Sequence, residues 1–223
     1  MKLFAALFTA LILMVGVASA DMHEATVYVV HGIPGVTVDV ELEGDCALPG
    51  FEFGDIAGPL SLPEDTYNIK IRGSDGTCTG AIVLDLDVPF TAGQNVTVIA
   101  YLDDMGNPTA KVFDNDFSAT GRGKARWIVH HTAYAPMIDV KVMREDADEP
   151  ALVVEDFENG DQAVAETRPG EWYVTLTLPD SMDPVFGPTP VKVKPFTAYQ
   201  IFAVGDFGGG TFTYLVFPYD GLK

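Results

Sequence analysis

The chain has 223 residues and a formal net charge of −19 at pH 7, from 32 acidic and 13 basic side chains. This acidity argues against nucleic acid and anionic lipid as partners, because the chain would repel both. Dispersed carboxylates also keep an exported protein soluble, and we favour that explanation over a specific cation-binding role.

Residues 1–20 have the pattern of a secretory signal peptide. Lys2 gives a basic start, Leu3 to Val17 is apolar, and Ala18-Ser19-Ala20 matches the A-x-A cleavage pattern. The apolar stretch is shorter than the roughly 20 residues of a membrane-spanning helix, which is the alternative interpretation. We therefore expect cleavage after Ala20, no membrane span in the mature chain, and a secreted or periplasmic location.

The mature chain contains an internal repeat. When His31 is aligned with His130, five segments recur in the same order. The pairs are VVH with IVH, VTVDVEL with MIDVKV, LPEDTYNIKI with RPGEWYVTL, VPFTAGQNVTVIAY with KPFTAYQIFAVG, and AKVFDND with YLVFPYDG. A unit of about a hundred residues has the size of a small domain. We expect repeats over residues 21–117 and 126–223, joined by the linker SATGRGKA at 118–125.

Each repeat has the pattern of short β-strands. The segment TYNIKIRG alternates apolar Tyr67, Ile69 and Ile71 with polar neighbours, as a half-buried strand requires. Turn residues such as GIPG, GSDG and RPGE separate the β-branched runs, and no long segment has a helical period. About seven strands per repeat predict two tandem antiparallel β-sandwich domains, immunoglobulin-like or transthyretin-like.

The two cysteines, Cys46 and Cys78, both lie in the first repeat beside turn residues. In an exported protein such a pair predicts one disulfide, with two free thiols as the alternative.

A histidine ends the first strand of each repeat, and an aspartate lies in the second strand. His31 and His130 could act as metal ligands or general bases, or they could bond the backbone of the following turn. A metal site needs three or four converging ligands, and no H-x-H, H-E-x-x-H or C-x-x-C pattern occurs. Repetition favours a structural role. Asp39 and Asp139, in apolar strands, must then be hydrogen-bonded to a turn or to the histidine.

These residues give the chain a family resemblance. The stretch VHHTAYAPMIDVKV resembles the signature of secreted bacterial proteins known as domain of unknown function 4397, roughly V-H-x-S-P-x-A-P-x-V-D-V-Y-V. The second repeat matches it at Val129, His130, Ala135, Pro136, Asp139, Val140 and Val142. The first repeat keeps Val30, His31, Pro34, Val38, Asp39 and Val40, with one residue fewer between histidine and aspartate. The resemblance covers nearly all of the mature chain as two copies. It implies an exported β-sandwich repeat of the cell surface or envelope, and it implies no reaction.

Acidic loops at 103–107, 113–118 and 155–161 suggest a calcium-stabilised surface module as one alternative function. None of them meets the EF-hand spacing, so we expect solvated turn carboxylates and no cofactor. A hydrolase is the other alternative, but no G-x-S-x-G motif occurs, and we predict no catalytic residue.

Aromatic residues crowd the second repeat, and some of them could form a patch for protein or sugar contact. They are Trp127, Trp172, Tyr173, Tyr199, Phe202, Phe207, Phe212, Tyr214, Phe217 and Tyr219. The sequence therefore favours a secreted, non-catalytic protein with a binding, adhesion or envelope-structural role. Its partner would be a surface protein or glycan of unknown identity.

Overall fold

The computed structural model describes residues 23–222, so the predicted signal peptide and its cleavage site at Ala20 lie outside the described residues. The first half contains β1 (Glu24–His31), β2 (Val38–Leu42), β3 (Asp45–Phe51), β4 (Ile56–Pro63), β5 (Asp65–Gly73), β6 (Ile82–Phe90), β7 (Asn95–Leu102) and β8 (Pro108–Asp114). The second contains β9 (Ala125–His131), β10 (Ile138–Met143), β11 (Leu152–Phe157), β12 (Asp161–Thr167), β13 (Gly170–Thr177), β14 (Pro184–Val193), β15 (Thr197–Val204) and β16 (Thr213–Asp220).

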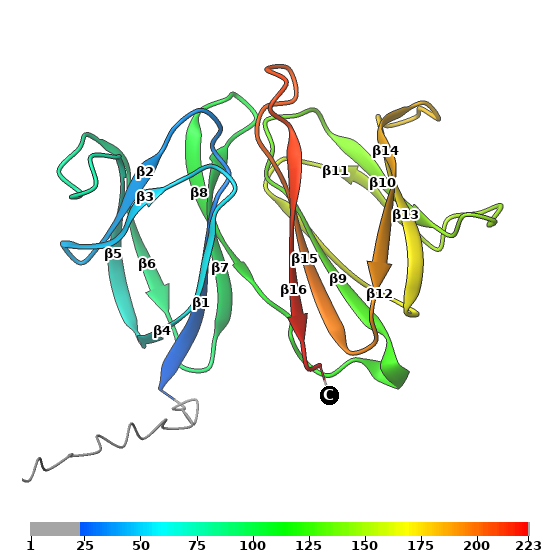
Figure 1. Ribbon diagram of the computed structural model, residues 1–223, viewed down its shortest axis with the longest axis horizontal. Helices are drawn as coiled ribbons and strands as arrows, with labels where there is room; N and C mark the ends of the chain where they lie inside the picture. Colours follow the sequence, from blue (N-terminus) through cyan, green and yellow to red (C-terminus); the bar gives the residue numbers. More distant parts are fainter. Residues whose placement is uncertain (1–22, 223) are drawn as a thin grey trace, which may run out of the picture.

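The strands form four sheets of four strands, stacked as four layers (Figure 1). In the first half, the outer sheet has the order β3-β2-β5-β6 and the inner sheet β4-β1-β7-β8. In the second half, the inner sheet is β12-β9-β15-β16 and the outer sheet β11-β10-β13-β14. The predicted all-β architecture of two sandwiches is confirmed.

Two details differ from the prediction. Each half has eight strands instead of about seven, because β3, β4 and β12 were not recognised in the sequence. The pairing is also not wholly antiparallel, since β1 pairs parallel with β7 and β9 pairs parallel with β15. Between the halves, the short 3₁₀ turn Gly121–Gly123 leads into β9. Within residues 23–222, no helix is long and apolar enough to cross a membrane.

A central strand of an inner sheet, such as β7, is mostly apolar because both of its faces are covered. In β7, every residue from Val96 to Tyr101 is buried, whereas β5 of the outer sheet buries Ile69 and Ile71 and leaves Lys70 partly exposed. A strand that is covered on both faces has a continuous hydrophobic sequence, whereas a strand that is covered on one face alternates apolar and polar residues. This difference in sequence pattern reflects the four-layer arrangement.

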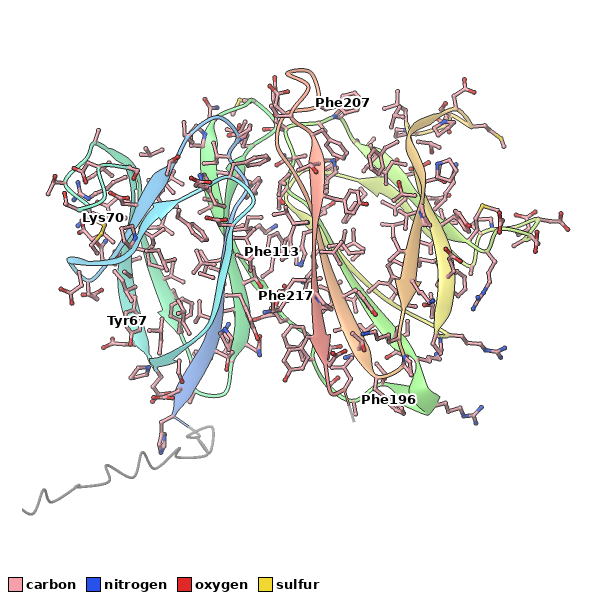
Figure 2. The ribbon with its side chains drawn as sticks, in the orientation of Figure 1. Tyr67, Lys70, Phe113, Phe196, Phe207 and Phe217 are labelled. Atoms are coloured by element: carbon pink, nitrogen blue, oxygen red, sulfur yellow. A yellow bond between two sulfur atoms is a disulfide. The ribbon has the colours of Figure 1, made fainter. Side chains whose placement is uncertain are left out.

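Each sandwich has its own apolar core, and a third apolar cluster joins the two inner sheets. The third cluster contains Val30, Ile99, Tyr101 and Phe113 of the first half and Phe202 and Val204 of the second. Figure 2 shows Phe113 and Phe217 between the halves, and Phe217 packs on Tyr28 with ring centroids 5.2 Å apart. The two halves therefore share a hydrophobic interface.

Candidate functional site

The first strand of each half ends in a buried histidine that closes the following turn. In the first half, His31 Nε2 lies 3.1 Å from the carbonyl oxygen of Val36. The Ile33 N–H donates to Nδ1 over 3.4 Å, so Nε2 carries the proton and donates to Val36. The ring also stacks on Phe51, with centroids 6.1 Å apart. Burial lowers the pKa of His31, which favours the neutral imidazole that this turn uses.

The residue that repeats this arrangement is His131, so the alignment of His31 with His130 is wrong by one position. His131 Nε2 lies 3.2 Å from the carbonyl oxygen of Pro136, five residues further on, just as His31 bonds Val36. The spacing from histidine to aspartate is then equal in the two halves (39 − 31 = 8 and 139 − 131 = 8). The turn has the same length in both copies, and the gap in the sequence alignment disappears.

His130 faces the opposite side of β9 and lies in the interface between the halves. Its ring centroid is 4.4 Å from that of Phe202, in a stacked arrangement, and 4.7 Å from that of Phe113, edge to face. Neither ring nitrogen has a hydrogen-bond partner within residues 23–222. Burial lowers the pKa of His130 to about 3. The equivalent position in the first half is Val30, so the interface accepts an apolar side chain there.

Asp39 organises the loop that follows β5. Its carboxylate accepts hydrogen bonds from three backbone N–H groups of segment 75–78, over 2.9 to 3.2 Å. It also accepts from the Gly50 N–H and from the Ser74 hydroxyl, each over 2.7 Å. Burial alone would raise the pKa of Asp39, but these hydrogen bonds outweigh it and hold the pKa well below its usual range. The carboxylate is fully engaged in holding the fold.

Asp139 has a smaller network at the equivalent place. It accepts a hydrogen bond from the Asp156 N–H over 3.0 Å. Asp156 stands where the first half has Gly50, and both have a left-handed backbone, with φ of 52° and 64°. The sequence left two partners open for these aspartates, the turn backbone or the histidine. Both aspartates accept hydrogen bonds from the backbone.

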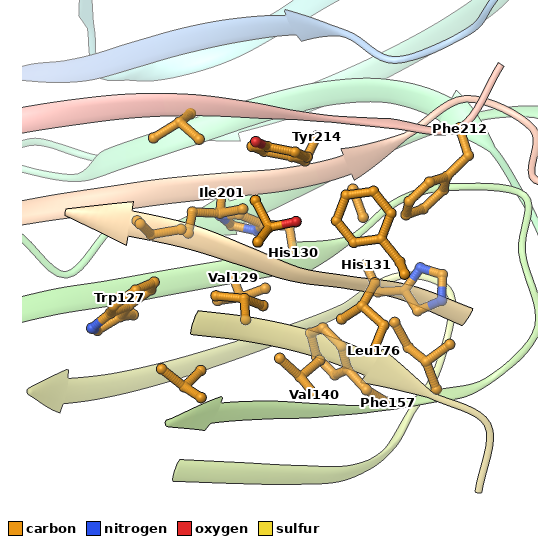
Figure 3. Close-up of a pocket in the computed structure, with 18 residues that line it drawn as sticks. Trp127, Val129, His130, His131, Val140, Phe157, Leu176, Ile201, Phe212 and Tyr214 are labelled. Carbon is orange, nitrogen blue, oxygen red and sulfur yellow. The ribbon is translucent and has the colours of Figure 1, made fainter. Parts of the chain in front are cut away.

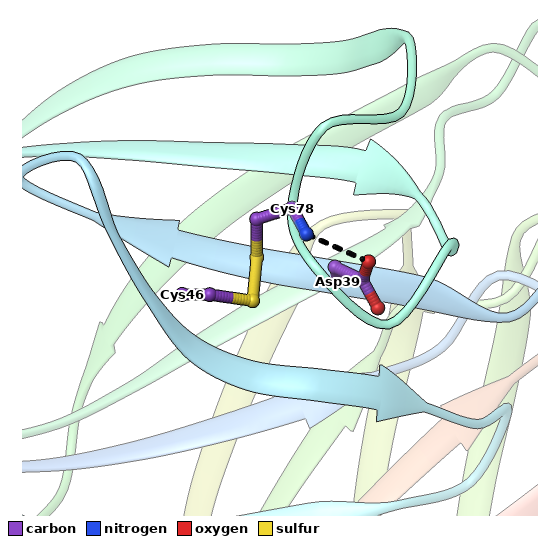
Figure 4. Close-up of side chains that lie close together, drawn as sticks. All are labelled: Asp39, Cys46 and Cys78. Carbon is purple, nitrogen blue, oxygen red and sulfur yellow. Dashed lines mark hydrogen bonds between the residues drawn. A yellow bond between two sulfur atoms is a disulfide. The ribbon is translucent and has the colours of Figure 1, made fainter.

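Cys46 and Cys78 form the predicted disulfide, with Cα atoms 5.5 Å apart. Together with Asp39 they are the one group of potential metal ligands that converges within the described chain. Figure 4 shows that the two sulfurs are bonded to each other and that the Cys78 N–H donates to Asp39. The disulfide explains this proximity, because metal-binding cysteines are thiolates.

The acidic loops suggested as calcium sites use their carboxylates to close their own turns. Asp103 accepts from two backbone N–H groups of its turn, over 2.9 and 2.8 Å, and the Asn107 N–H contributes most to lowering its pKa. Asp116 accepts from the Ser118 hydroxyl and pairs with Arg126. Asp161 accepts from the backbone N–H of residue 158. These contacts fit carboxylates that stabilise turns.

Exposed apolar side chains gather at one end of the molecule, on loops of the second half and on the adjoining loop 103–107 of the first half, and we call this surface the aromatic end. It comprises the loops 103–107, 132–137, 178–183 and 205–212 together with Phe186 of β14 (Figure 1). Its exposed members include Met105, Tyr134, Met137, Leu178, Met182 and Phe207. Figure 2 shows Phe207 at this end and Phe196 at the opposite end of the molecule.

Direct contacts link three of these loops and Phe186. The Gly106 backbone touches the Tyr134 ring so closely that a β-carbon there would lie 3.3 Å from it. The Phe207 N–H donates to the Tyr134 carbonyl oxygen over 2.9 Å. The Phe212 ring then lies 5.8 Å from Phe207 and 5.5 Å from Phe186. Sequence reasoning grouped these aromatics by composition but could not assign their faces.

Comparison with known proteins gives one clear result. A family model described as domain of unknown function (DUF4397) matches residues 25–141. The chain belongs to this family. The match to DUF4397 spans the first half and ends in β10, so it does not extend over the remainder of the second half. No functionally curated protein matches the chain.

One solved structure similar to this DUF4397 protein is that of the Bacillus anthracis TIE protein, with a TM-score of 0.25 and 8% sequence identity. The similarity covers 82% of this chain and 49% of the TIE chain, so the chain spans about half the length of that protein.

Proposed function

We propose that this DUF4397 protein is an exported, non-catalytic binding module whose contact surface is the aromatic end. The single observation that carries the proposal is the gathering of exposed Met105, Tyr134 and Phe207 on loops that contact one another at Gly106, Tyr134, Phe207 and Phe212. Loops held by a rigid scaffold are common binding sites, and exposed apolar patches with aromatic and methionine side chains are typical of protein interfaces.

The charges around this surface favour a protein partner with a basic rim. Asp104, Asp180 and Asp183 are exposed on the loops of the aromatic end. Carboxylates around an apolar centre complement basic groups on a partner and repel anionic surfaces. The partner class that fits is a protein surface with an apolar centre and lysine or arginine at its edge.

The candidate catalytic residues support the non-catalytic part of the proposal. His31 and His131 donate to turn carbonyls, His130 is enclosed by phenylalanine rings, and Asp39 is saturated with hydrogen bonds from the fold. Each of these groups has a structural explanation. Export is supported by the disulfide, and N-terminal sequencing of the mature protein should begin at Asp21.

Site-specific photo-crosslinking in the producing cell tests the binding surface. p-Benzoylphenylalanine would replace Phe207 in one variant and Phe196 in a matched control, since the two side chains are 42% and 38% exposed at opposite ends. We expect a protease-sensitive adduct from position 207 and none from position 196. Equal adducts from both positions, or none from position 207, would contradict the proposal.

A further inference from the structure

Each of the four sheets of the described chain ends in two edge strands, and seven of these eight strands carry a feature that discourages further pairing. Proline lies in β3, β4, β6, β8, β14 and β16, and the pairing of β11 with β10 has an irregular register. Such prolines and bulges stop an exposed edge from pairing with another chain. Within residues 23–222, β12 is the one edge strand that has neither. Its edge is therefore open to a further strand.

The backbone of β12 directs three residues toward this open edge. In β9, the Thr132 N–H donates to β15, whereas the His131 carbonyl oxygen accepts a hydrogen bond from the turn that leads into β12. Successive residues of a strand direct their N–H and C=O groups to opposite sides. His131 lies opposite Asp161, so the odd-numbered residues of β12 bond β9. The even-numbered residues face the open edge, where no backbone group of the described chain pairs with them. These residues are Gln162, Val164 and Glu166.

The side chains of β12 leave room for a neighbouring strand. Figure 3 shows Trp127 and Val129 of β9 along the core of the second sandwich, and Ala165 and Ala163 lie opposite them in the register. Both alanines are partly exposed although they are small, so this edge is not covered. Val164 points to the other face of the sheet and is 48% exposed. An approaching strand would meet small side chains and would cover an exposed valine.

The charged groups of β12 do not block pairing. Glu166 forms an ion pair with the buried Arg126 over 2.8 Å, and Lys124 lies 3.5 Å from its other carboxylate oxygen. Asp161 accepts a hydrogen bond from the Glu158 N–H over 3.1 Å, at the turn that begins the strand. Lysine is the charged residue that most often protects an edge, and β12 contains none. Both acidic side chains of the strand are thus already engaged.

We propose that β12 pairs with β12 of a second copy of this chain, in antiparallel register about a two-fold axis at Val164. In this register the outward groups meet one another, since Val164 lies opposite Val164 and Gln162 lies opposite Glu166 on either side. Each hydrogen-bonded pair of an antiparallel ladder exchanges two bonds, so these three pairs, at two bonds each, give about six backbone hydrogen bonds. The inner sheets of the two second halves would join into one continuous sheet.

The sequence of β12 favours a second copy over an unrelated strand. About Val164 it is nearly palindromic, because Ala163 lies opposite Ala165 and Asp161 lies opposite Thr167. No like charges face each other, which matters in a chain of formal net charge −19, since opposed like charges destabilise a ladder. The pairing goes beyond the proposed function and does not depend on it, since β12 contributes no residue to the aromatic end. Because the two strands are antiparallel, the aromatic ends of the two copies would point in opposite directions.

Sedimentation velocity of the purified protein over a concentration series tests the pairing. We expect a reversible monomer–dimer equilibrium that strengthens with added salt, because salt screens the repulsion between two acidic chains. Val164→Pro removes an outward N–H and no bond to β9, so the variant should fold and stay monomeric. Val164→Lys places like charges across the axis and should raise the Kd of the dimer about tenfold or more. Val216→Lys is the matched control and should dimerise like the wild type, because Val216 is 40% exposed on β16, the opposite edge of the same sheet.

A cysteine at the axis tests the register. Opposed residues of a hydrogen-bonded antiparallel pair have Cα atoms about 5.5 Å apart, within reach of a disulfide. With dissolved oxygen as the oxidant, Val164→Cys should form a covalent dimer and Val216→Cys should not. If Val164→Pro does not fold, Val164→Lys takes its place. A chain that stays monomeric at every concentration would leave this edge to a strand of another protein and would overturn the proposal. A dimer that survives Val164→Lys undiminished, or that does not crosslink through position 164, would overturn it too.

Discussion

Replacing His130 with leucine should stabilise the protein, and increasingly so as the pH falls. Both ring nitrogens of His130 are buried without a partner in the described chain, between Phe113 and Phe202. A buried polar group without a hydrogen bond costs about 1–3 kcal/mol, and an apolar residue of similar size avoids that cost. Val30 occupies the equivalent position in the first half, so an aliphatic side chain suits this interface.

The pH dependence follows from the lowered pKa of His130, which is about 3 in the folded protein. An unfolded histidine has a pKa near 6.5, so between pH 6.5 and 3 the unfolded state binds more protons. The stability of the wild type therefore falls as the pH falls through this range. From pH 8 to pH 5 the loss due to His130 alone is about 2 kcal/mol. The leucine variant should lack this loss.

Thermal and urea unfolding at pH 8 and pH 5 would measure the effect. We expect His130→Leu to melt higher at pH 8, and the difference to widen by about 4–8 °C at pH 5, at roughly 2–4 °C per kcal/mol. His131→Leu is the control, because it removes the hydrogen bond to Pro136 and should lower stability instead. The reasoning is refuted if His130→Leu destabilises the protein at both pH values, or if its stability falls with pH as steeply as that of the wild type.

Three further predictions concern the two strand aspartates, the disulfide and the acidic loops. Asp139→Ala should lower the melting temperature, and Asp39→Ala should lower it more, because Asp39 accepts five hydrogen bonds and Asp139 accepts one. An unchanged melting temperature for folded Asp139→Ala would contradict its structural role. Replacing Cys46 and Cys78 with alanine should cost roughly 3–4 kcal/mol in urea unfolding, since their bridge closes a loop with a sequence separation of 32. Addition of EDTA and then of calcium should leave the melting temperature unchanged, because the turn carboxylates accept hydrogen bonds from the backbone of their own turns. A rise in melting temperature that depends on calcium would favour the calcium-stabilised module instead.

The strands that the sequence revealed and those that it did not differ in their place in the sheets. β5 and β7 were evident because alternation or a continuous apolar run marks them. The three missed strands, β3, β4 and β12, all lie at sheet edges. Their segments DCALPGF, IAGPLSLP and DQAVAET contain proline, glycine, alanine or charged residues, which are poor strand formers. They become strands because β2, β1 and β9 offer backbone partners, and that information is tertiary.

The histidine alignment shows a different limit of sequence reasoning. Matching the Val-His pairs placed His31 with His130 and required a gap, whereas anchoring on Asp39 and Asp139 requires none and selects His131. Equal spacing between histidine and aspartate identified the equivalent histidine better than residue identity did. The reason is that the hydrogen bond of the turn depends on the number of residues it spans. The disulfide was predictable from the cysteine count. The aromatic end was not, since it depends on which loops meet in space.

The contact between the halves explains why one repeated sequence has produced two different surfaces. Thr97 of β7 and Gln200 of β15 occupy equivalent positions, and their side chains meet across the interface, with Thr97 Oγ1 3.2 Å from Gln200 Oε1. Equivalent residues contact each other only near a two-fold axis, so the inner sheets pack as in an isologous dimer. Residues on that axis are constrained in both copies. The sides away from it are free to diverge: β14 of the second half contains Pro184, Pro188 and Pro190, whereas β6, its counterpart in the first half, contains only Pro89.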